Sequence, residues 1–199
     1  MANLEKEVLD YANYKVDDIT LTIIWSDRTK EELETVYHID WCGHTDFRGN
    51  ILHIAVINGS KHLVEFLLET KKLNPNSICF MDKYPTNALA LATDNDYIHL
   101  IPTLLKNGAD CNDRTLECSM TPFHSFCASG YSVDTFDSDY EESSWLVDDF
   151  NIVLKSFLDH GAKADIDDDE GDTPLHTAQK NGAVLLPGLL LNEKLNYHK

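Results

Sequence analysis

Three cysteines and a histidine are the first residues of this sequence whose types could bind a metal. Structural zinc sites usually take their ligands from pairs that lie two to four residues apart. This group contains no such pair of cysteines, and the repeat described below assigns two of the cysteines to positions for small residues. We therefore expect no zinc site. The four residues are Cys111, Cys118, His124 and Cys127.

Cys42 and His44 offer a second kind of chemistry, a cysteine nucleophile activated by a histidine base. Only Gly43 separates them. Side chains so close in sequence rarely face each other well enough for proton transfer, and no donor for an oxyanion can be named. We expect no catalysis from this tripeptide.

Closely spaced aspartates near the C-terminus are a third candidate, because carboxylates can bind calcium. The helix–loop–helix calcium motif requires glycine at its sixth loop position and glutamate at its twelfth. Counted from Asp165, these positions hold Glu170 and His176. The motif therefore fails, and no phosphate-binding glycine loop or nucleophile elbow is present either. The sequence predicts no catalytic residue, no metal and no cofactor.

Composition and charge narrow the classes of partner. The chain has 199 residues, of which 43% are hydrophobic, and it contains no apolar run of the roughly 18 residues that a membrane span needs. A net charge of −18 disfavours nucleic acid and favours a protein partner with a basic surface. The odd number of cysteines, five, indicates reduced thiols, so we expect a cytoplasmic or nuclear protein. A role in binding another protein predicts a monomer.

Four segments share one pattern, and this internal repeat predicts the fold. Each begins with a residue that can cap a helix, and a leucine or phenylalanine follows two residues later. The segments start 37, 34 and 52 residues apart. Gly108 and Gly161 follow apolar runs at places where a helix end needs a left-handed backbone. The starting residues are Asn50, Asn87, Thr121 and Thr173.

A histidine stands three residues after the start of three of these segments. These residues are His53, His124 and His176, while Ala90 takes the place in the second segment. Recurrence at one position of a repeat indicates a structural role. We expect each histidine to form a hydrogen bond with backbone near a hairpin.

The pattern resembles the ankyrin repeat, which is about 33 residues long and carries Thr-Pro-Leu-His in its first helix. The best match is Thr173-Pro174-Leu175-His176, and Gly108 to Asn112 matches the loop after the second helix. The resemblance covers residues 45–191. It implies an all-α fold, a solenoid of stacked helix pairs with hairpin loops.

The resemblance also implies a division of the chain. Residues 1–44 are expected to be an N-terminal helical cap or a degenerate repeat, with amphipathic helices at Leu4 to Tyr14 and Thr29 to Tyr37. Residues 192–199 form a tail. The four repeats are expected at about 45–81, 82–115, 116–167 and 168–191.

The third repeat is longer than the others because of an insertion at residues 131–149. Five aromatic residues and seven carboxylates lie between residues 131 and 150. Two interpretations stay open: a docking element for a basic, partly apolar partner, or a loop whose aromatic residues pack on the convex side of the stack. The candidate contacts are Phe136, Tyr140 and Trp145, and Ser138 is a candidate phosphorylation site because Glu141 follows it.

Ankyrin proteins bind partners through hairpin tips and the exposed side of their first helices, and the resemblance transfers these roles position by position. Asn112 also resembles asparagines that a hydroxylase modifies in ankyrin proteins. The predicted tip residues are Asp46, Phe47, Lys83, Tyr84, Glu117, Met120, Asp169 and Glu170, and the predicted first-helix residues are Ile57, Asn58, Asp94, Asn95 and Lys180.

The sequence thus favours a protein–protein interaction module, an adaptor or inhibitor without enzymatic activity. Short, divergent repeats with an insertion also resemble those of ankyrin proteins that viruses and intracellular bacteria deliver into host cells. One alternative is the ankyrin part of an enzyme whose catalytic residues lie outside this chain or in residues 1–44. Another is an acidic surface that imitates nucleic acid and blocks a basic site.

Overall fold

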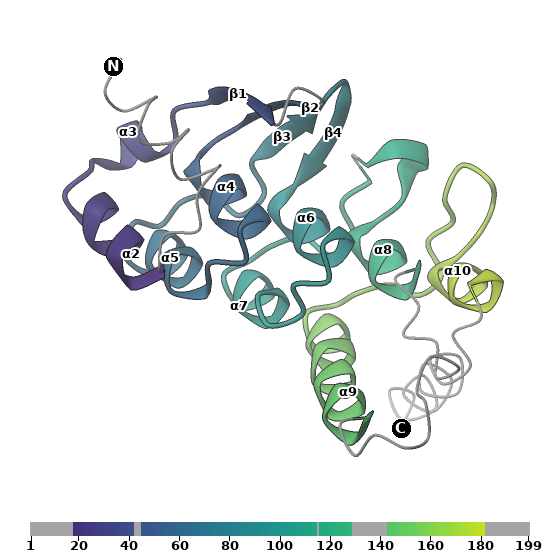
Figure 1. The fold of residues 1–199 in the computed structure, drawn as a ribbon. Helices are drawn as coiled ribbons and strands as arrows, with labels where there is room; N and C mark the ends of the chain where they lie inside the picture. The colour runs from purple at the N-terminus through teal and green to yellow at the C-terminus, as the bar shows by residue number, and fades with distance from the viewer. Residues whose placement is uncertain (1–17, 42–44, 115, 129–142, 182–199) are drawn as a thin grey trace. The chain divides into compact units, whose positions relative to one another are not determined.

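The computed structural model describes residues 18–41, 45–114, 116–128 and 143–181 (Figure 1). The chain divides into two compact units, Met1–Asp110 and Cys111–Lys199. The helix predicted at residues 4–14 and the predicted tail lie outside the described residues. No helix within the described ranges is long and apolar enough to cross a membrane.

The first unit contains two complete helix pairs. α4 (Ile51–Ile57) packs on α5 (Lys61–Glu65), which continues as a short π-helix, η1 (Phe66–Thr70). α6 (Ala88–Asp94) packs on α7 (Ile101–Lys106), and α4 also packs on α6, which joins the two pairs.

An additional helix precedes these pairs. α2 (Asp18–Ser26) packs on α5, so it lies on the side of the second helices, and the short α3 (Lys30–Leu33) follows it. The ammonium group of Lys71, just after η1, donates to the carbonyl oxygens of Ser26 at 2.7 Å and Arg28 at 2.8 Å. A positive charge is favourable at the C-terminal end of a helix, so Lys71 ties α2 to η1.

Four antiparallel strands form a sheet along one side of these helices (Figure 1). Neighbouring strands are hydrogen-bonded in chain order, and the registers place Phe47 opposite Met81 and Arg48 opposite Phe80. The prediction of an all-α fold is therefore only roughly right, because the hairpins are long enough to pair with one another. The strands are β1 (Tyr37–Trp41), β2 (Thr45–Gly49), β3 (Ile78–Met81) and β4 (Tyr84–Asn87).

The helix predicted at residues 29–37 is shorter than expected. α3 ends at Leu33, and β1 begins at Tyr37. Tyr37 and Ile39 are buried whereas His38 between them is exposed, which is the alternation of a strand with one buried face. The apolar residues here follow a period of two, and the helix stops for that reason.

The predicted capping residues start the first helices as expected. The side chain of Asn50 accepts hydrogen bonds from the backbone N–H groups of Leu52 and His53, and Asn87 accepts one from Ala90. Thr173 does the same for α10 (Pro174–Lys180). These bonds satisfy donors that a helix start otherwise leaves unpaired.

The second unit is held by a cluster of aromatic rings. Its described elements are the 3₁₀ turn η2 (Glu117–Ser119), α8 (Pro122–Ala128), α9 (Ser143–Asp159) and α10, which packs on α8. Phe126 of α8 stacks on Phe150 of α9 with ring centroids 4.7 Å apart, and it lies 5.1 Å from Phe157. These aromatic contacts fix α9 on α8.

The predicted insertion is not wholly a loop. Residues 143–149 form the first two turns of α9, which has 17 residues against 6 in α7. Phe150, the last aromatic residue of the insertion region, is buried. For this residue the packing interpretation holds.

Candidate protein-binding surface

His53 joins the first helix of its repeat to the following hairpin. Its Nδ1 atom accepts from the backbone N–H of Asn50 at 3.2 Å, and its Nε2 atom lies 2.9 Å from the carbonyl oxygen of Ser77. Nε2 must therefore carry the proton and donate it. Burial lowers the pKa of His53 to about 4, although the bond to Ser77 opposes this shift. The predicted structural role is confirmed.

His124 makes the same connection in the second unit. Its Nδ1 accepts from the N–H of Thr121 at 3.1 Å, and its Nε2 lies 3.1 Å from the carbonyl oxygen of Asp172. Burial lowers the pKa of this imidazole as well. Because both ring nitrogens of each buried histidine bind backbone, neither imidazole is placed to act on a substrate.

Two asparagines form a further set of bridges between loops. The amide of Asn76 donates to the carbonyl of Gly108 at 2.8 Å and accepts from the N–H of Asp110 at 2.7 Å. Asn112 repeats this pattern with Gly161 at 2.9 Å and Lys163 at 2.9 Å. Asn112, the predicted modification site, thus has a structural role, and hydroxylation there stays a prediction.

The ends of the first two hairpins are joined by reciprocal hydrogen bonds. The N–H of Asp46 donates to the carboxylate of Asp82 at 2.8 Å, and the N–H of Asp82 donates to the carbonyl of Asp46 at 2.7 Å. Arg48 donates to the carbonyl of Asp82 at 3.0 Å, and its guanidinium lies 4.9 Å from the centre of the Phe80 ring. Both hairpins therefore present one connected surface.

Lys83 and Tyr84 complete this surface at the turn between β3 and β4. Both side chains are exposed, and the Lys83 ammonium lies 5.2 Å from the centre of the Tyr84 ring. A cation held over an aromatic ring is partly ordered before any partner arrives, which lowers the entropy cost of binding. The hairpin surface is defined here as Asp46, Arg48, Phe80, Asp82, Lys83 and Tyr84.

Phe47 does not belong to this surface. We predicted it as an exposed anchor, but its side chain is 0% exposed. In β2 it points to the face opposite Asp46 and Arg48, so it packs in the core. The sequence reasoning did not place Arg48 and Phe80 on this surface, and the period of two in the strands was the signal that could have revealed them.

The predicted first-helix positions are only partly accessible. Ile57 and Asn58 are half-buried at the end of α4, whereas Asp94 and Asn95 are exposed at the end of α6. The Asn95 amide donates back to the carbonyl of Leu91 at 2.8 Å, so it also caps its helix.

The hairpin end of the second unit is acidic. Glu117, Asp169 and Glu170 are exposed, and Met120 is half-buried. The N–H of Asp169 donates to the carbonyl of Cys118 at 2.9 Å, which brings the two loops together. Partial desolvation and the negative charges of Glu117 and Asp169 raise the pKa of the Cys118 thiol.

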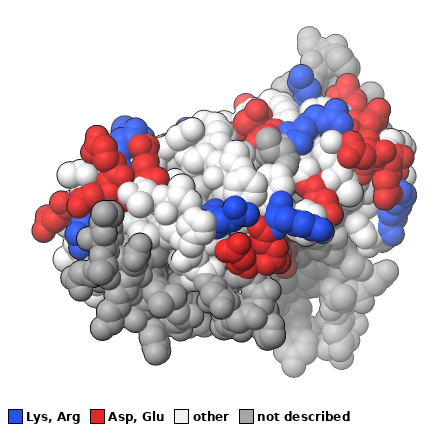
Figure 2. Space-filling view, turned by 90° about the horizontal axis from the view of Figure 1, so that it is seen from above, with Lys and Arg blue, Asp and Glu red and all other residues white. Residues whose placement is uncertain are grey.

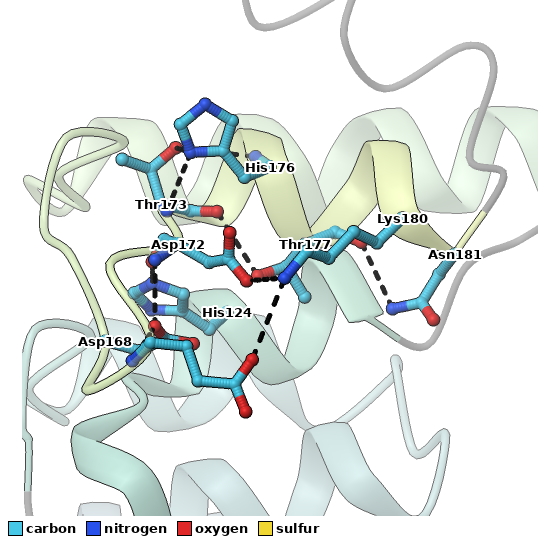
Figure 3. A network of polar contacts seen from close by, with 9 residues as sticks. His124, Asp168, Asp172, Thr173, His176, Thr177, Lys180 and Asn181 are labelled. Carbon is cyan, nitrogen blue, oxygen red and sulfur yellow. Dashed lines mark hydrogen bonds and ion pairs between the residues drawn. The ribbon is translucent and has the colours of Figure 1, made fainter.

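Lys180 is the cation of this acidic region, and it is held within the unit. Its ammonium group contacts the carboxylate of Asp172 directly and that of Glu170 at 3.7 Å (Figure 3). Hydrogen bonding to Asp172 raises its pKa. Asp168 lies beside them and accepts from the N–H groups of Glu170 and Asp172, both at 2.9 Å. A partner that binds Glu170 must therefore compete with Lys180.

The residues considered for a zinc site do not share one environment, and those considered for a cysteine nucleophile lie outside the described residues. Cys111 and Cys127 are buried whereas Cys118 is exposed, and burial raises the pKa of the Cys127 thiol. The ranges that the structure describes contain no group of three His, Cys, Asp or Glu residues able to hold a metal ion. Cys42, Gly43 and His44 lie outside these ranges.

Most of the insertion also lies outside the described residues. This applies to Phe136, Ser138 and Tyr140, while Trp145 belongs to α9 but its side chain is not described. Seen from above, the Lys and Arg side chains of the described residues lie among Asp and Glu side chains (Figure 2).

Comparison with known proteins finds a family match over part of the chain. Residues 29–115 match the family model for ankyrin repeats in three copies. The matched range begins within the predicted cap and includes β1 and β2. No curated protein is significantly similar to the chain.

Proposed function

Because residues 29–115 are ankyrin repeats, which are generally protein–protein interaction modules, we propose that this chain is a non-catalytic adaptor or inhibitor of another protein. The partner lies across the hairpin ends and the exposed ends of the first helices. The observation that carries the proposal is the hairpin surface, where the Lys83–Tyr84 pair is exposed and the half-buried Arg48–Phe80 pair is fixed by the bond from Arg48 to the carbonyl oxygen of Asp82.

In this proposal, the hairpin surface supplies the side chain that contributes most to the binding energy. Tyr84 is 40% exposed, although large aromatic side chains are usually buried, and tyrosine and arginine dominate binding energy in many interfaces. Asp46 and Asp82 are occupied by bonds within the surface. The ring of Tyr84 with Lys83 over it is the part most able to contact a partner.

The acidic hairpin end of the second unit supplies long-range attraction. Glu117, Asp169 and Glu170 are exposed carboxylates, and the insertion adds more between residues 131 and 149. Such charges mainly raise the rate of association with a basic partner. We therefore propose a partner that presents both a basic region and an apolar or aromatic region.

The test is affinity capture from cell lysate with the tagged full chain and three variants. One combines Lys83→Ala with Tyr84→Ala, the second combines Asp169→Lys with Glu170→Lys, and the third lacks residues 131–142. The deletion stops at residue 142 because α9 begins at Ser143. A second-helix variant, Lys61→Ala with His62→Ala, is the matched control because both residues are exposed on α5.

We expect the hairpin variant to weaken binding of one partner about tenfold, roughly 1.4 kcal/mol, while thermal unfolding is unchanged. The control variant should keep that partner. If the control loses the partner and the hairpin variant retains it, the proposed surface is wrong. If only the deletion loses it, recognition lies in the insertion.

A further inference from the structure

Three asparagines of the chain are each followed directly by a glycine. Asparagine in this context can lose its amide group, because glycine has no side chain to keep its backbone nitrogen away from the asparagine side chain. These residues are Asn58, Asn107 and Asn181, and they stand at the C-terminal ends of α4, α7 and α10. By sequence and by place at a helix end, the three are equivalent.

Asn58 and Asn107 also have nearly the same backbone. The φ and ψ angles are −86° and −1° at Asn58, and −92° and 12° at Asn107. In both places the N–H of the following glycine donates at 2.9 Å to the carbonyl oxygen three residues earlier. The backbone therefore favours the reaction at neither asparagine.

The side-chain amides of these asparagines differ. Nδ2 of Asn107 donates to the carbonyl oxygen of Thr103 at 2.9 Å. Asn181 donates in the same way to Thr177 at 3.1 Å. Nδ2 of Asn58 is buried and has no hydrogen-bond partner among the described residues. A buried donor without a partner raises the free energy of the side chain that carries it, and this amide has no bond to break before it reacts.

We propose that Asn58 is a site of spontaneous deamidation. The backbone nitrogen of Gly59 attacks Cγ of Asn58, so that a new C–N bond forms and the bond from Cγ to Nδ2 breaks. The proton of the Gly59 N–H leaves with Nδ2 as ammonia, and a cyclic imide remains. Water then opens the imide and gives aspartate or isoaspartate. Water is the only co-reactant, and no oxidant or reductant takes part.

Either product changes the end of α4. Both carry a negative charge at the C-terminal end of the helix, where the helix dipole disfavours it. Isoaspartate also lengthens the main chain by one carbon in the connection of residues 58–60 between α4 and α5. Because α4 packs on α5, we expect the modified chain to unfold at a lower temperature.

Ageing of the full chain at mildly alkaline pH tests the proposal. Peptide mass spectrometry follows the change from amide to carboxyl at Asn58 and at Asn107, and each rate is divided by the rate in urea-unfolded protein. This ratio removes the effect of the neighbouring sequence. We expect the ratio at Asn58 to be about fivefold higher, because Asn107 must first break its bond to Thr103.

Thermal unfolding of the aged samples gives a second readout. The unfolding midpoint of the wild type should fall with time, and Asn58→Gln should prevent this fall. Asn107→Gln is the matched control and should leave the fall unchanged.

Two outcomes overturn the proposal. Equal ratios at the two asparagines mean that the unpaired amide has no effect on the reaction. A lower ratio at Asn58 assigns control to the ring of Tyr97, which would lie 3.0 Å from a methyl group placed on Gly59. Partner binding plays no part in these measurements, so their result is independent of the proposed function.

Discussion

At the scale of single residues, the buried histidines make stability depend on pH. The pKa of His53 is lowered to about 4 by burial, against an ordinary value near 6.5 in the unfolded chain. Between these values the unfolded state binds a proton that the folded state excludes. The contribution of this pKa difference to the free energy of unfolding is therefore complete above pH 6.5. It is lost as the pH falls toward 4.

We predict that the free energy of unfolding falls by about 2 kcal/mol between pH 7 and pH 5 through His53 alone. His53→Gln should be less stable at pH 7 but should show a shallower pH dependence. Urea unfolding at pH 7, 6 and 5 measures both effects. Val36→Ala, at an exposed residue that does not titrate, is the control and should keep the wild-type slope. Identical slopes for His53→Gln and wild type would refute the assignment.

A second residue-scale prediction concerns Lys71, which caps the end of α2. Lys71→Met removes a charged donor from the carbonyls of Ser26 and Arg28, so we expect a loss of about 1–2 kcal/mol. The backbone amides of α2 should then exchange hydrogen faster in mass spectrometry, while those of α7 keep their rate. Lys61→Met, at an exposed lysine of α5, should change neither. Unchanged exchange in α2 would show that Lys71 does not hold it.

At the scale of elements, the sheet depends on the close approach of β2 and β3. A methyl group on Gly49 would lie 2.5 Å from the Phe47 ring and 2.9 Å from the Cys79 side chain, both of which are buried. We predict that Gly49→Ala destabilises the protein by about 2 kcal/mol. The thermal unfolding midpoint reports the change.

Phe47→Leu provides the internal check on this prediction. It frees the space that the new methyl group needs, so the double variant should lose less stability than the two single losses together. Gly108→Ala is the comparison at an uncrowded site, where only the left-handed backbone, with φ of 91°, opposes the substitution. Strict additivity at Gly49 and Phe47 would contradict the steric explanation.

The elements also show how far sequence reasoning reaches. Helix starts were predictable because Asn50, Asn87 and Thr173 cap locally, through bonds to the next three residues. The sheet was not, because each strand has only four or five residues and its stability comes from a neighbouring hairpin about 33 residues away. For this reason Phe47 was assigned to the surface and Arg48 was overlooked.

At the scale of the whole molecule, charge and shape have different roles in the proposed binding. The net charge of −18 acts at long range, whereas Tyr84 acts only on contact. Fourteen of the acidic residues lie between residues 131 and 172, together with only two lysines. The sequence alone reveals this excess of acidic residues. It does not reveal that Lys180 forms ion pairs with Glu170 and Asp172.

We predict that these two roles separate in the kinetics of the captured partner. Asp169→Lys with Glu170→Lys should lower the association rate about tenfold and weaken its salt dependence. Tyr84→Ala should instead raise the dissociation rate. Surface plasmon resonance at low and high ionic strength measures both constants. If salt does not affect the association rate, the acidic hairpin end of the second unit does not attract the partner electrostatically.

The bridges between neighbouring repeats end on main-chain atoms. His53 reaches the carbonyl of Ser77, Asn76 that of Gly108 and Asn112 that of Gly161. A carbonyl oxygen is present whatever the side chain, so the acceptor half of each bridge survives almost any mutation. Residues on the hairpin ends can therefore be exchanged while the repeats stay joined. Such an architecture lets the residues on the hairpin ends vary while the frame beneath them stays the same.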